Sequence, residues 1–408
     1  MTTAVGSASH APRRGRSSRP DELSVRFIDR DADLEDLVDE VGDAIDYAID
    51  TEFHRERTYF AQLALVQLAW NGGVAAIDPL AVDLVPLKKI LRGQGTAVIH
   101  AADQDLEVLE RSTGAVPARM FDTQLAARFL GMSSPSLVSL ADKMLGIRLE
   151  KGDQLADWTR RPLRREQIQY AAHDVAHLIE LKAAISDELS RRGRLEWAEE
   201  ECAVLLERAR ALPLPEQAWW RLRQARQFRG SARGVAQSVA AWRERRAQTI
   251  DRPVRYVLSD LAVAAIAHRP PHSRTDLEHV RNLDLRSLSQ GIVAELLGAV
   301  AEGESLSGSA IAVPPGPDGA GVAKPAVALA LAYAGELART LDIDASLLAT
   351  RADVIDFLQV PPTGRLTETW RHHLVGEPLA RLAAGNAALA LQGGDLVIEE
   401  RSFRPISS

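Results

Sequence analysis

The stretch Tyr47-Ala48-Ile49-Asp50-Thr51-Glu52 predicts a short strand that ends in two acids. Because Asp50 and Glu52 are two residues apart, both carboxylates leave the same face of the sheet. Neighbouring carboxylates repel each other unless a cation lies between them, and such an oxygen-rich pair suits Mg²⁺ or Mn²⁺. Taken alone, the pair is more typical of an edge-strand surface, so a metal site requires further acids.

Other strand patterns surround this stretch. They fall at 24–28, 60–70, 74–77 and 97–100. The turn signal Asn71-Gly72-Gly73 predicts that the second and third of these strands form an antiparallel hairpin. A helical segment separates the first strand from the stretch at 47–52, and helical patterns dominate from Asp103 to about residue 200. Strands followed by helices predict one α/β domain with a mixed sheet.

The remaining chain predicts further domains, since 408 residues exceed what one hydrophobic core usually supports. Pro213 and Pro215 mark a boundary, after which helical periodicity continues without convincing strands. A segment dense in Gly, Pro, Ser and Ala interrupts the helices. The predicted organisation is a flexible tail at 1–22, an α/β domain at 23–205, an all-α domain at 212–300, a linker at 302–325 and a second helical domain at 326–408.

Composition limits the class of protein. Apolar residues make up 46% and charged residues 26% of the chain, as in ordinary globular proteins. The single cysteine, Cys202, has no partner for a disulfide or a cysteine-rich zinc site, so we expect a reducing, cytoplasmic location. No apolar run reaches the roughly 18 residues that suggest a membrane span, so we expect no membrane association.

Charge is unevenly distributed. The net charge of −7 argues against a protein that coats nucleic acid non-specifically. The segment from Glu216 to Arg246, however, contains eight arginines and only two glutamates. Such a segment is typical of a phosphate-binding face and equally of a solvated helix surface. The candidates for phosphate contacts include Arg221, Arg223 and Arg226.

Three more residues complete a candidate site. Asp105 follows the strand at 97–100 near a helix start, where the helix dipole favours an anion. We expect Asp103 to cap that helix and Asp105 to bind metal. Tyr170 and Asp174 are four apart in a helix predicted at 166–185, so they share one face. Either feature alone is common, but the five residues together are specific.

These motifs resemble the ribonuclease D family. The resemblance rests on Ile49-Asp50-Thr51-Glu52-Phe53, Arg57-Thr58-Tyr59, Leu65-Val66-Gln67-Leu68, His100-Ala101-Ala102-Asp103-Gln104-Asp105-Leu106, Phe121-Asp122-Thr123-Gln124-Leu125-Ala126-Ala127, Trp158-Thr159-Arg160-Arg161-Pro162-Leu163 and Gln169-Tyr170-Ala171-Ala172-His173-Asp174-Val175. It implies a ribonuclease H-like fold and the DEDDy class of 3′–5′ exonucleases. It also implies two divalent ions, Mg²⁺ or Mn²⁺, and catalytic roles for Asp50, Glu52, Asp105, Tyr170 and Asp174.

The resemblance also implies the substrate and the partners. We expect an RNA with a free 3′ end, such as a transfer-RNA precursor or another structured RNA, shortened to 5′-nucleoside monophosphates. We expect a monomer without a nucleotide cofactor. Arg57, Arg160 and Arg161 lie near the motifs, and the sequence leaves open whether they bind phosphates or pair with acids.

The helical part resembles the HRDC module that follows the nuclease in this family. The similar segments are Trp219 to Phe228, Trp242 to Ala247, Asp251-Arg252-Pro253 and Val257-Leu258-Ser259-Asp260. Beyond residue 325, a second HRDC-like module rests on family architecture alone. Two rival functions stay open: a DNA 3′–5′ exonuclease with the same carboxylate chemistry, and a non-catalytic RNA-binding protein. The motifs do not separate RNA from DNA, because that distinction depends on contacts to the 2′-hydroxyl.

Overall fold

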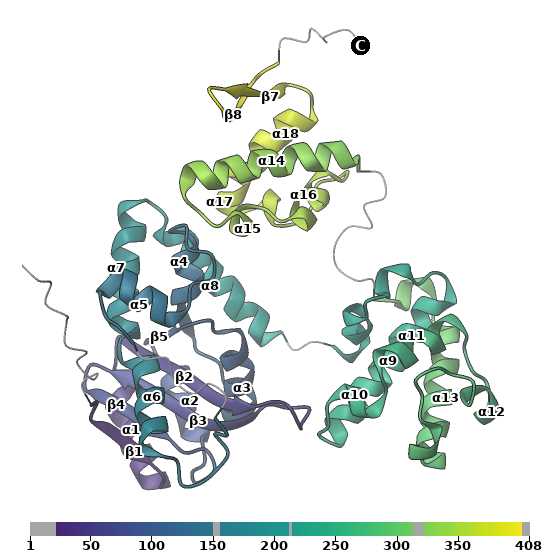
Figure 1. Ribbon diagram of the computed structural model, residues 1–408, viewed down its shortest axis with the longest axis horizontal. Coiled ribbons are helices and arrows are strands. Elements are labelled where there is room, and N and C mark those ends of the chain that lie inside the picture. Colours follow the sequence, from purple (N-terminus) through teal and green to yellow (C-terminus); the bar gives the residue numbers. More distant parts are fainter. Residues whose placement is uncertain (1–21, 150–155, 212–213, 313–321, 402–408) are drawn as a thin grey trace, which may run out of the picture.

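The computed structural model describes residues 22–149, 156–211, 214–312 and 322–401, which form three units (Figure 1). The first unit contains a six-stranded mixed sheet in the order β1-β4-β3-β2-β5-β6, which confirms the predicted fold class. β3 lies antiparallel to β2 and β4, whereas the other neighbours are parallel. The strands are β1 (Val25–Ile28), β2 (Asp46–His54), β3 (Gln62–Trp70), β4 (Gly73–Ile77), β5 (Thr96–Ile99) and β6 (Arg119–Asp122).

Alternate residues of the sheet face two different cores. Ala48 and Val98 belong to one apolar cluster, and Ile49 and Ile99 belong to the other. This follows from the two-residue period of a strand and explains why these strands are apolar on both faces. The helices of the unit are α1 (Asp31–Val41), α2 (Lys88–Leu91), α3 (Asp103–Thr113), α4 (Thr123–Arg128), α5 (Leu137–Leu145), α6 (Arg165–Ala176), α7 (Leu178–Arg191) and α8 (Leu195–Arg210).

Two local predictions for this unit were wrong. The helix predicted at 166–185 is two helices, α6 and α7, because His177 leaves helical geometry at φ −110° and ψ 3°. No Gly or Pro marks this break in the sequence. Edge strand β6 was missed because the chain from Asp103 to about residue 200 was expected to be mostly helical. The backbone N–H of Asp122 in β6 donates to the Cys202 sulfur at 3.3 Å, which joins this strand to α8.

The second unit is all-helical in its described part. It comprises α9 (Ser231–Thr249), α10 (Val254–Val257), α11 (Asp260–His268), α12 (Arg274–Leu277) and α13 (Gln290–Ser305). Helices α9 and α13 cross at Gly234 and Gly303, where a Cβ on Gly303 would lie 2.5 Å from the Val235 Cα. α13 therefore extends into the segment predicted as a linker, 302–325. Gly303, which the composition assigned to that linker, instead allows the two helices to pack closely. The central linker residues, 313–321, and the tail residues, 1–21, lie outside the described parts.

The third unit contains α14 (Lys324–Leu341), α15 (Ala345–Leu348), α16 (Arg351–Leu358), α17 (Thr369–Arg371), the π-helical turn η7 (His372–Gly376) and α18 (Glu377–Ala383). It ends in an antiparallel hairpin of β7 (Ala387–Gln392) and β8 (Asp395–Glu400), so the expectation of a purely helical unit was wrong. The sequence does contain a hairpin signal, the pair Gly393-Gly394. Both glycines adopt positive φ in the two-residue turn.

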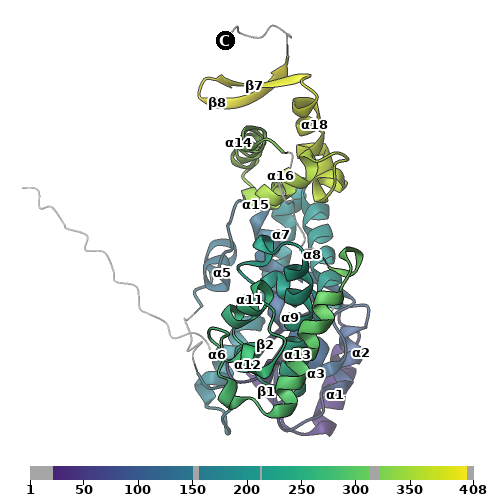
Figure 2. The same ribbon diagram turned by 90° about the vertical axis from the view of Figure 1, so that its right-hand side faces the viewer.

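The third unit packs against the helices of the first unit (Figure 2). The Trp370 ring stacks on Trp197 at a centroid distance of 5.0 Å and meets Phe129 edge-on at 5.5 Å. Arg194 of the first unit donates to the carbonyls of Phe129 and Leu341. Among the described residues, no helix has both the length and the apolar character required to cross a bilayer.

Candidate active site

Strand β2 carries the first two acids of the predicted site. Asp50 faces Gln67 across the β2–β3 ladder, and Glu52 faces Leu65. The pairing of β2 with β5 ends at Ala48, so both acids lie beyond the part of β2 that β5 covers. The central strand thus presents two carboxylates at a point where the sheet leaves room for other groups.

Asp105 joins them from the first turn of α3. Its carboxylate is buried, and its Oδ1 accepts a 2.5 Å hydrogen bond from the Thr51 hydroxyl of β2. This bond links the helix to the strand residue between Asp50 and Glu52. Burial raises the pKa of Asp105 to about 6, although the bond from Thr51 opposes the rise.

Helix α6 supplies the last two residues. Tyr170 donates a hydrogen bond to the Asp174 carboxylate, as their four-residue spacing predicts. The Trp158 ring lies 6.2 Å from the Tyr170 ring and is buried with Leu65, Leu163 and Ala171, so it has the packing role that its residue type favours.

Charge interactions link the four carboxylates. Burial raises the pKa of Asp50 well above its usual range, and repulsion from Asp105, Asp174 and Glu52 raises it further. Burial, with Asp174 and Asp105, raises the pKa of Glu52 to about 8. Burial also raises the pKa of Asp174 to about 7. Acids from a strand and two helices therefore lie close enough to interact through their charges.

The donor set fits hard divalent cations. Asp105 and Asp174 raise the pKa of both Asp50 and Glu52. Carboxylates crowded in this way are stabilised in the charged form when cations lie between them, and oxygen ligands suit Mg²⁺ and Mn²⁺. Gln67, opposite Asp50 on the same face, is fully buried, and neither its amide nitrogen nor its oxygen has a hydrogen-bond partner among the described residues. An unpaired buried amide beside crowded acids is consistent with a site that holds ions and water.

The capping role expected for Asp103 was wrong. Asp103 is exposed and is the first residue of α3, so the N-cap position falls on Ala102, whose own side chain makes no capping bond. Asp122 at the end of β6 takes this part, accepting from the backbone N–H groups of Ala101 and Ala102 while also capping α4. Sequence reasoning missed Thr51, Gln67 and Asp122 as supporting residues, although all three lie within the quoted motifs.

The predicted arginines have different surroundings. Arg161 makes the ion pair that the sequence left open: its Nε and Nη2 donate to the two Asp78 oxygens at 2.5 and 2.6 Å. Arg160 is exposed, with a 3.6 Å ion pair to Asp157, and Arg57 is exposed in the β2–β3 loop. Arg221, Arg223 and Arg226 are exposed in the second unit, where Arg221 lies 3.4 Å from Glu244.

The β2–β3 loop, residues 55–61, connects the site to the second unit. The Tyr59 hydroxyl donates to the buried Glu244 carboxylate at 2.5 Å and accepts from Gln248 at 3.0 Å. One Asp251 oxygen accepts the backbone N–H groups of Tyr59 and Phe60, both at 3.1 Å. α9 and the residues after it therefore hold the loop that continues the strand of Asp50 and Glu52.

Replacing Tyr59 by phenylalanine is expected to weaken this docking, because it removes a hydrogen bond to a charged group that contributes about 1.5–3 kcal/mol. We expect the KM for a long RNA to rise several-fold while turnover of a short oligonucleotide changes little. Steady-state kinetics on both substrates measure this, with exposed Tyr256→Phe as the matched control. Unchanged KM values in Tyr59→Phe would contradict the proposed contribution of the contact.

The raised pKa values predict how stability depends on pH without metal. In the folded protein the pKa values of Glu52, Asp174 and Asp105 are about 8, 7 and 6, so these groups stay protonated to higher pH than in the unfolded chain. Their stabilising contribution is complete below about pH 4, where the unfolded chain is also protonated, and is lost as pH rises through 6 to 8. We expect the Tm in EDTA to fall between pH 5.5 and 8.5 and Mg²⁺ to reduce that fall. Calorimetry checks it, and a Tm that rises over this window would count against the shared site.

Comparisons with known proteins agree with this architecture. A 3′–5′ exonuclease family model matches residues 25–190, and an HRDC domain model matches residues 232–300. Ribonuclease D of Sphingobium indicum is 36% identical over 358 residues, covering 86% of this chain and 92% of that protein. Ribonuclease D of Jannaschia sp. is 38% identical over 363 residues, covering 86% and 93%.

A solved structure extends the agreement to three dimensions. The crystal structure of Escherichia coli RNase D, described as an exoribonuclease involved in structured RNA processing, matches with a TM-score of 0.78 at 30% identity. The match covers 89% of this chain and 99% of that one. The exonuclease fold of this family depends on divalent metal. The chain belongs to the ribonuclease D family.

Proposed function

We propose that the chain is a 3′–5′ exoribonuclease whose reaction is carried out by Asp50, Glu52, Asp105, Asp174 and Tyr170. The observation that carries the proposal is the meeting of four acids from β2, α3 and α6, each with a raised pKa. Such crowding costs stability without a cation, so it has a function in binding one. Membership of the ribonuclease D family supplies the reaction: hydrolysis of phosphodiester bonds from the RNA 3′ end.

The acids divide the work of holding two divalent ions, Mg²⁺ or Mn²⁺. When bound, two such ions activate the attacking water and relieve charge on the leaving oxygen. Asp50, which interacts with the other three carboxylates, would serve both ions. Asp174 raises the pKa of Glu52, so these two carboxylates are near each other; they would hold the ion on the side of the attacking water, and Asp105 would hold the other.

Tyr170 is proposed to orient the water. Its hydroxyl is hydrogen-bonded to Asp174, and it would position a water oxygen against the phosphorus without giving up its own proton. An unperturbed tyrosine, with a pKa of about 10, is scarcely deprotonated at neutral pH, so it is a positioning group rather than a base. The water oxygen bonds to phosphorus and loses a proton to solvent, the bond from phosphorus to the 3′ oxygen of the preceding nucleotide breaks, and that oxygen takes up a proton from solvent. A 5′-nucleoside monophosphate is released.

The substrate is proposed to be structured RNA, transfer-RNA precursors included, bound by a monomer that needs no nucleotide cofactor. Exposed Arg57, Arg160, Arg221, Arg223 and Arg226 are candidates for contacts to phosphates, which position a nucleic acid without reading its sequence. We omit Arg161 from this set, because Asp78 occupies its guanidinium. The single cysteine supports a reducing, cytoplasmic location.

The decisive experiment compares a 3′-extended RNA with a DNA of the same sequence, in Mg²⁺, in Mn²⁺ and in EDTA. We expect stepwise release of 5′-monophosphates from RNA only when a divalent ion is present. Equal or faster digestion of DNA would favour the DNA-exonuclease alternative. Binding of RNA without digestion under any condition would instead favour the non-catalytic alternative.

A further inference from the structure

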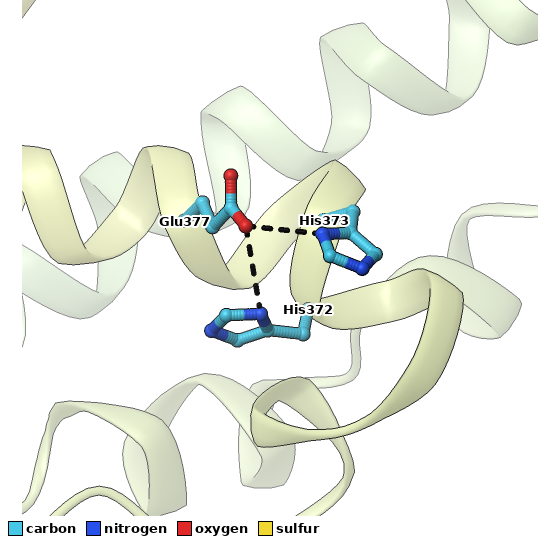
Figure 3. A group of neighbouring side chains, drawn as sticks. All are labelled: His372, His373 and Glu377. Atoms are coloured by element: carbon cyan, nitrogen blue, oxygen red, sulfur yellow. Dashed lines mark hydrogen bonds and ion pairs between the residues drawn. The ribbon is translucent and has the colours of Figure 1, made fainter.

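Three potential metal ligands meet in the third unit, far from the carboxylate site. Figure 3 shows the imidazoles of His372 and His373 directed toward one carboxylate oxygen of Glu377. The Glu377 Oε1 lies 3.0 Å from the His373 Nδ1 and 3.8 Å from the His372 Nδ1. One ligand atom of each residue lies within 4.8 Å of the others, and among the described residues no other group of three His, Cys, Asp or Glu side chains comes this close together.

The π-helical turn η7 brings the three residues together. In an α-helix, neighbours such as His372 and His373 point in different directions. Glu377, four residues after His373, would share a face with His373 but not with His372, which lies five residues before it. Here the Glu377 backbone N–H bonds to the His372 carbonyl, the five-residue spacing of a π turn. This wider turn places Glu377 above the two histidines, so it can contact both.

Pro378 lies just beyond the turn. A proline inside a helix has no N–H, so the carbonyl four residues earlier loses its α-helical partner. That carbonyl belongs to Leu374, and it accepts from the Tyr333 hydroxyl at 3.4 Å instead. The two histidines at the start of the π-helical turn and Glu377 directly after it are thus three potential metal ligands that converge.

Contacts to neighbouring segments hold the backbone of the turn in place. A Cβ on Gly376 would lie 2.3 Å from the Leu366 carbonyl oxygen, so glycine is needed where the turn packs closely. Arg371, immediately before the histidines, is buried, bonds to the Leu347 carbonyl at 2.7 Å and pairs with Glu201 of the first unit. The backbone beneath the three ligands is thus anchored on both sides, while the ligands themselves reach solvent.

We propose that His372, His373 and Glu377 bind one divalent transition-metal ion of the zinc class. Two imidazoles and one carboxylate suit Zn²⁺, whereas the oxygen-only catalytic site suits Mg²⁺ or Mn²⁺. Two ligands about 2.1 Å from one ion lie at most about 4.2 Å apart. The side chains therefore close by less than an ångström, which their exposure permits. A water completes the coordination, and the ion stiffens the segment that docks on α8.

Zinc binding to the full-length protein tests the proposal. Titration with Zn²⁺ followed by calorimetry is carried out in excess Mg²⁺, which occupies the carboxylate site, and is repeated in the Asp50→Asn protein. We expect one zinc equivalent that remains in Asp50→Asn and is lost, or weakened at least tenfold, in His372→Ala and His373→Ala. His272→Ala is the matched control, because His272 is an exposed histidine paired with a single carboxylate, Glu304, at 3.6 Å. It should bind zinc normally.

Two further observations decide the outcome. All three ligand residues are solvent-accessible, so their variants should keep the wild-type Tm without metal, and only the wild-type and His272→Ala proteins should gain Tm on adding Zn²⁺. Zinc binding of wild-type affinity in the His372→Ala/His373→Ala double variant would overturn the proposal, as would the absence of any zinc equivalent in the Asp50→Asn protein. Neither result bears on the exoribonuclease assignment, because catalysis requires none of these residues.

Discussion

Replacing Asp50 by asparagine is expected to lower the rate of RNA digestion by about 10³-fold or more, the size of effect seen when one essential catalytic group is lost. Asp50 interacts with all three other carboxylates, so an amide at this position removes the charge that serves both ions. Single-turnover digestion at saturating Mg²⁺ isolates the chemical step from RNA binding.

The fold should survive this substitution. Because the four acids repel one another without metal, Asp50→Asn should keep or raise the Tm in EDTA. Asp103→Asn is the matched control, since Asp103 is an exposed acid on the same helix turn as Asp105. It should digest RNA at the wild-type rate. Normal activity of Asp50→Asn would refute the assignment of the site.

Replacing Arg161 by alanine is expected to reduce the free energy of unfolding by about 3 kcal/mol, the lower end of what breaking a buried ion pair costs. The Arg161 side chain is 25% exposed and that of Asp78 only 7%. Its Nη2 also donates to the Ala64 carbonyl at 2.7 Å, and its Nη1 to the Trp158 carbonyl at 2.8 Å. The variant would leave the Asp78 charge buried without its counter-charge.

Chemical denaturation measures this effect. The neighbouring Arg160→Ala is the control: the Arg160 side chain is 85% exposed, so its loss should change stability by about 0.5 kcal/mol or less. Arg161→Lys should recover only part of the loss, because an ammonium group cannot reproduce the two-point contact. Equal stability of the Arg160→Ala and Arg161→Ala proteins would show that the pair contributes little.

Much of the first unit was predictable because its signals are local. The Asn71-Gly72-Gly73 turn predicts the β3–β4 hairpin, and the spacing of Asp50 and Glu52 predicts their common face. The convergence of Asp105 and Asp174 on this face came from resemblance, since nothing local to either residue specifies a contact across more than fifty positions.

What escaped prediction depends on tertiary contacts or on very short elements. The Thr51 bond to Asp105, the Asp122 cap and the docking of Tyr59 on Glu244 all join residues distant in sequence. Gly303 was assigned to a linker by composition, although it fits a tight helix crossing. The β7–β8 hairpin was overlooked because the preceding helical pattern was extended through its Gly393-Gly394 turn.

The buried Cys202 has a practical consequence for following motion in this protein. Burial raises the pKa of its thiol to about 12, so it is almost wholly protonated at neutral pH and a poor nucleophile. As the sole native thiol, it leaves the surface free of competing targets for maleimide dyes. A pair of cysteines introduced at exposed positions of the first and second units can therefore carry a fluorescent donor and acceptor. Energy transfer between the dyes would report, one molecule at a time, whether the units separate while RNA is being shortened.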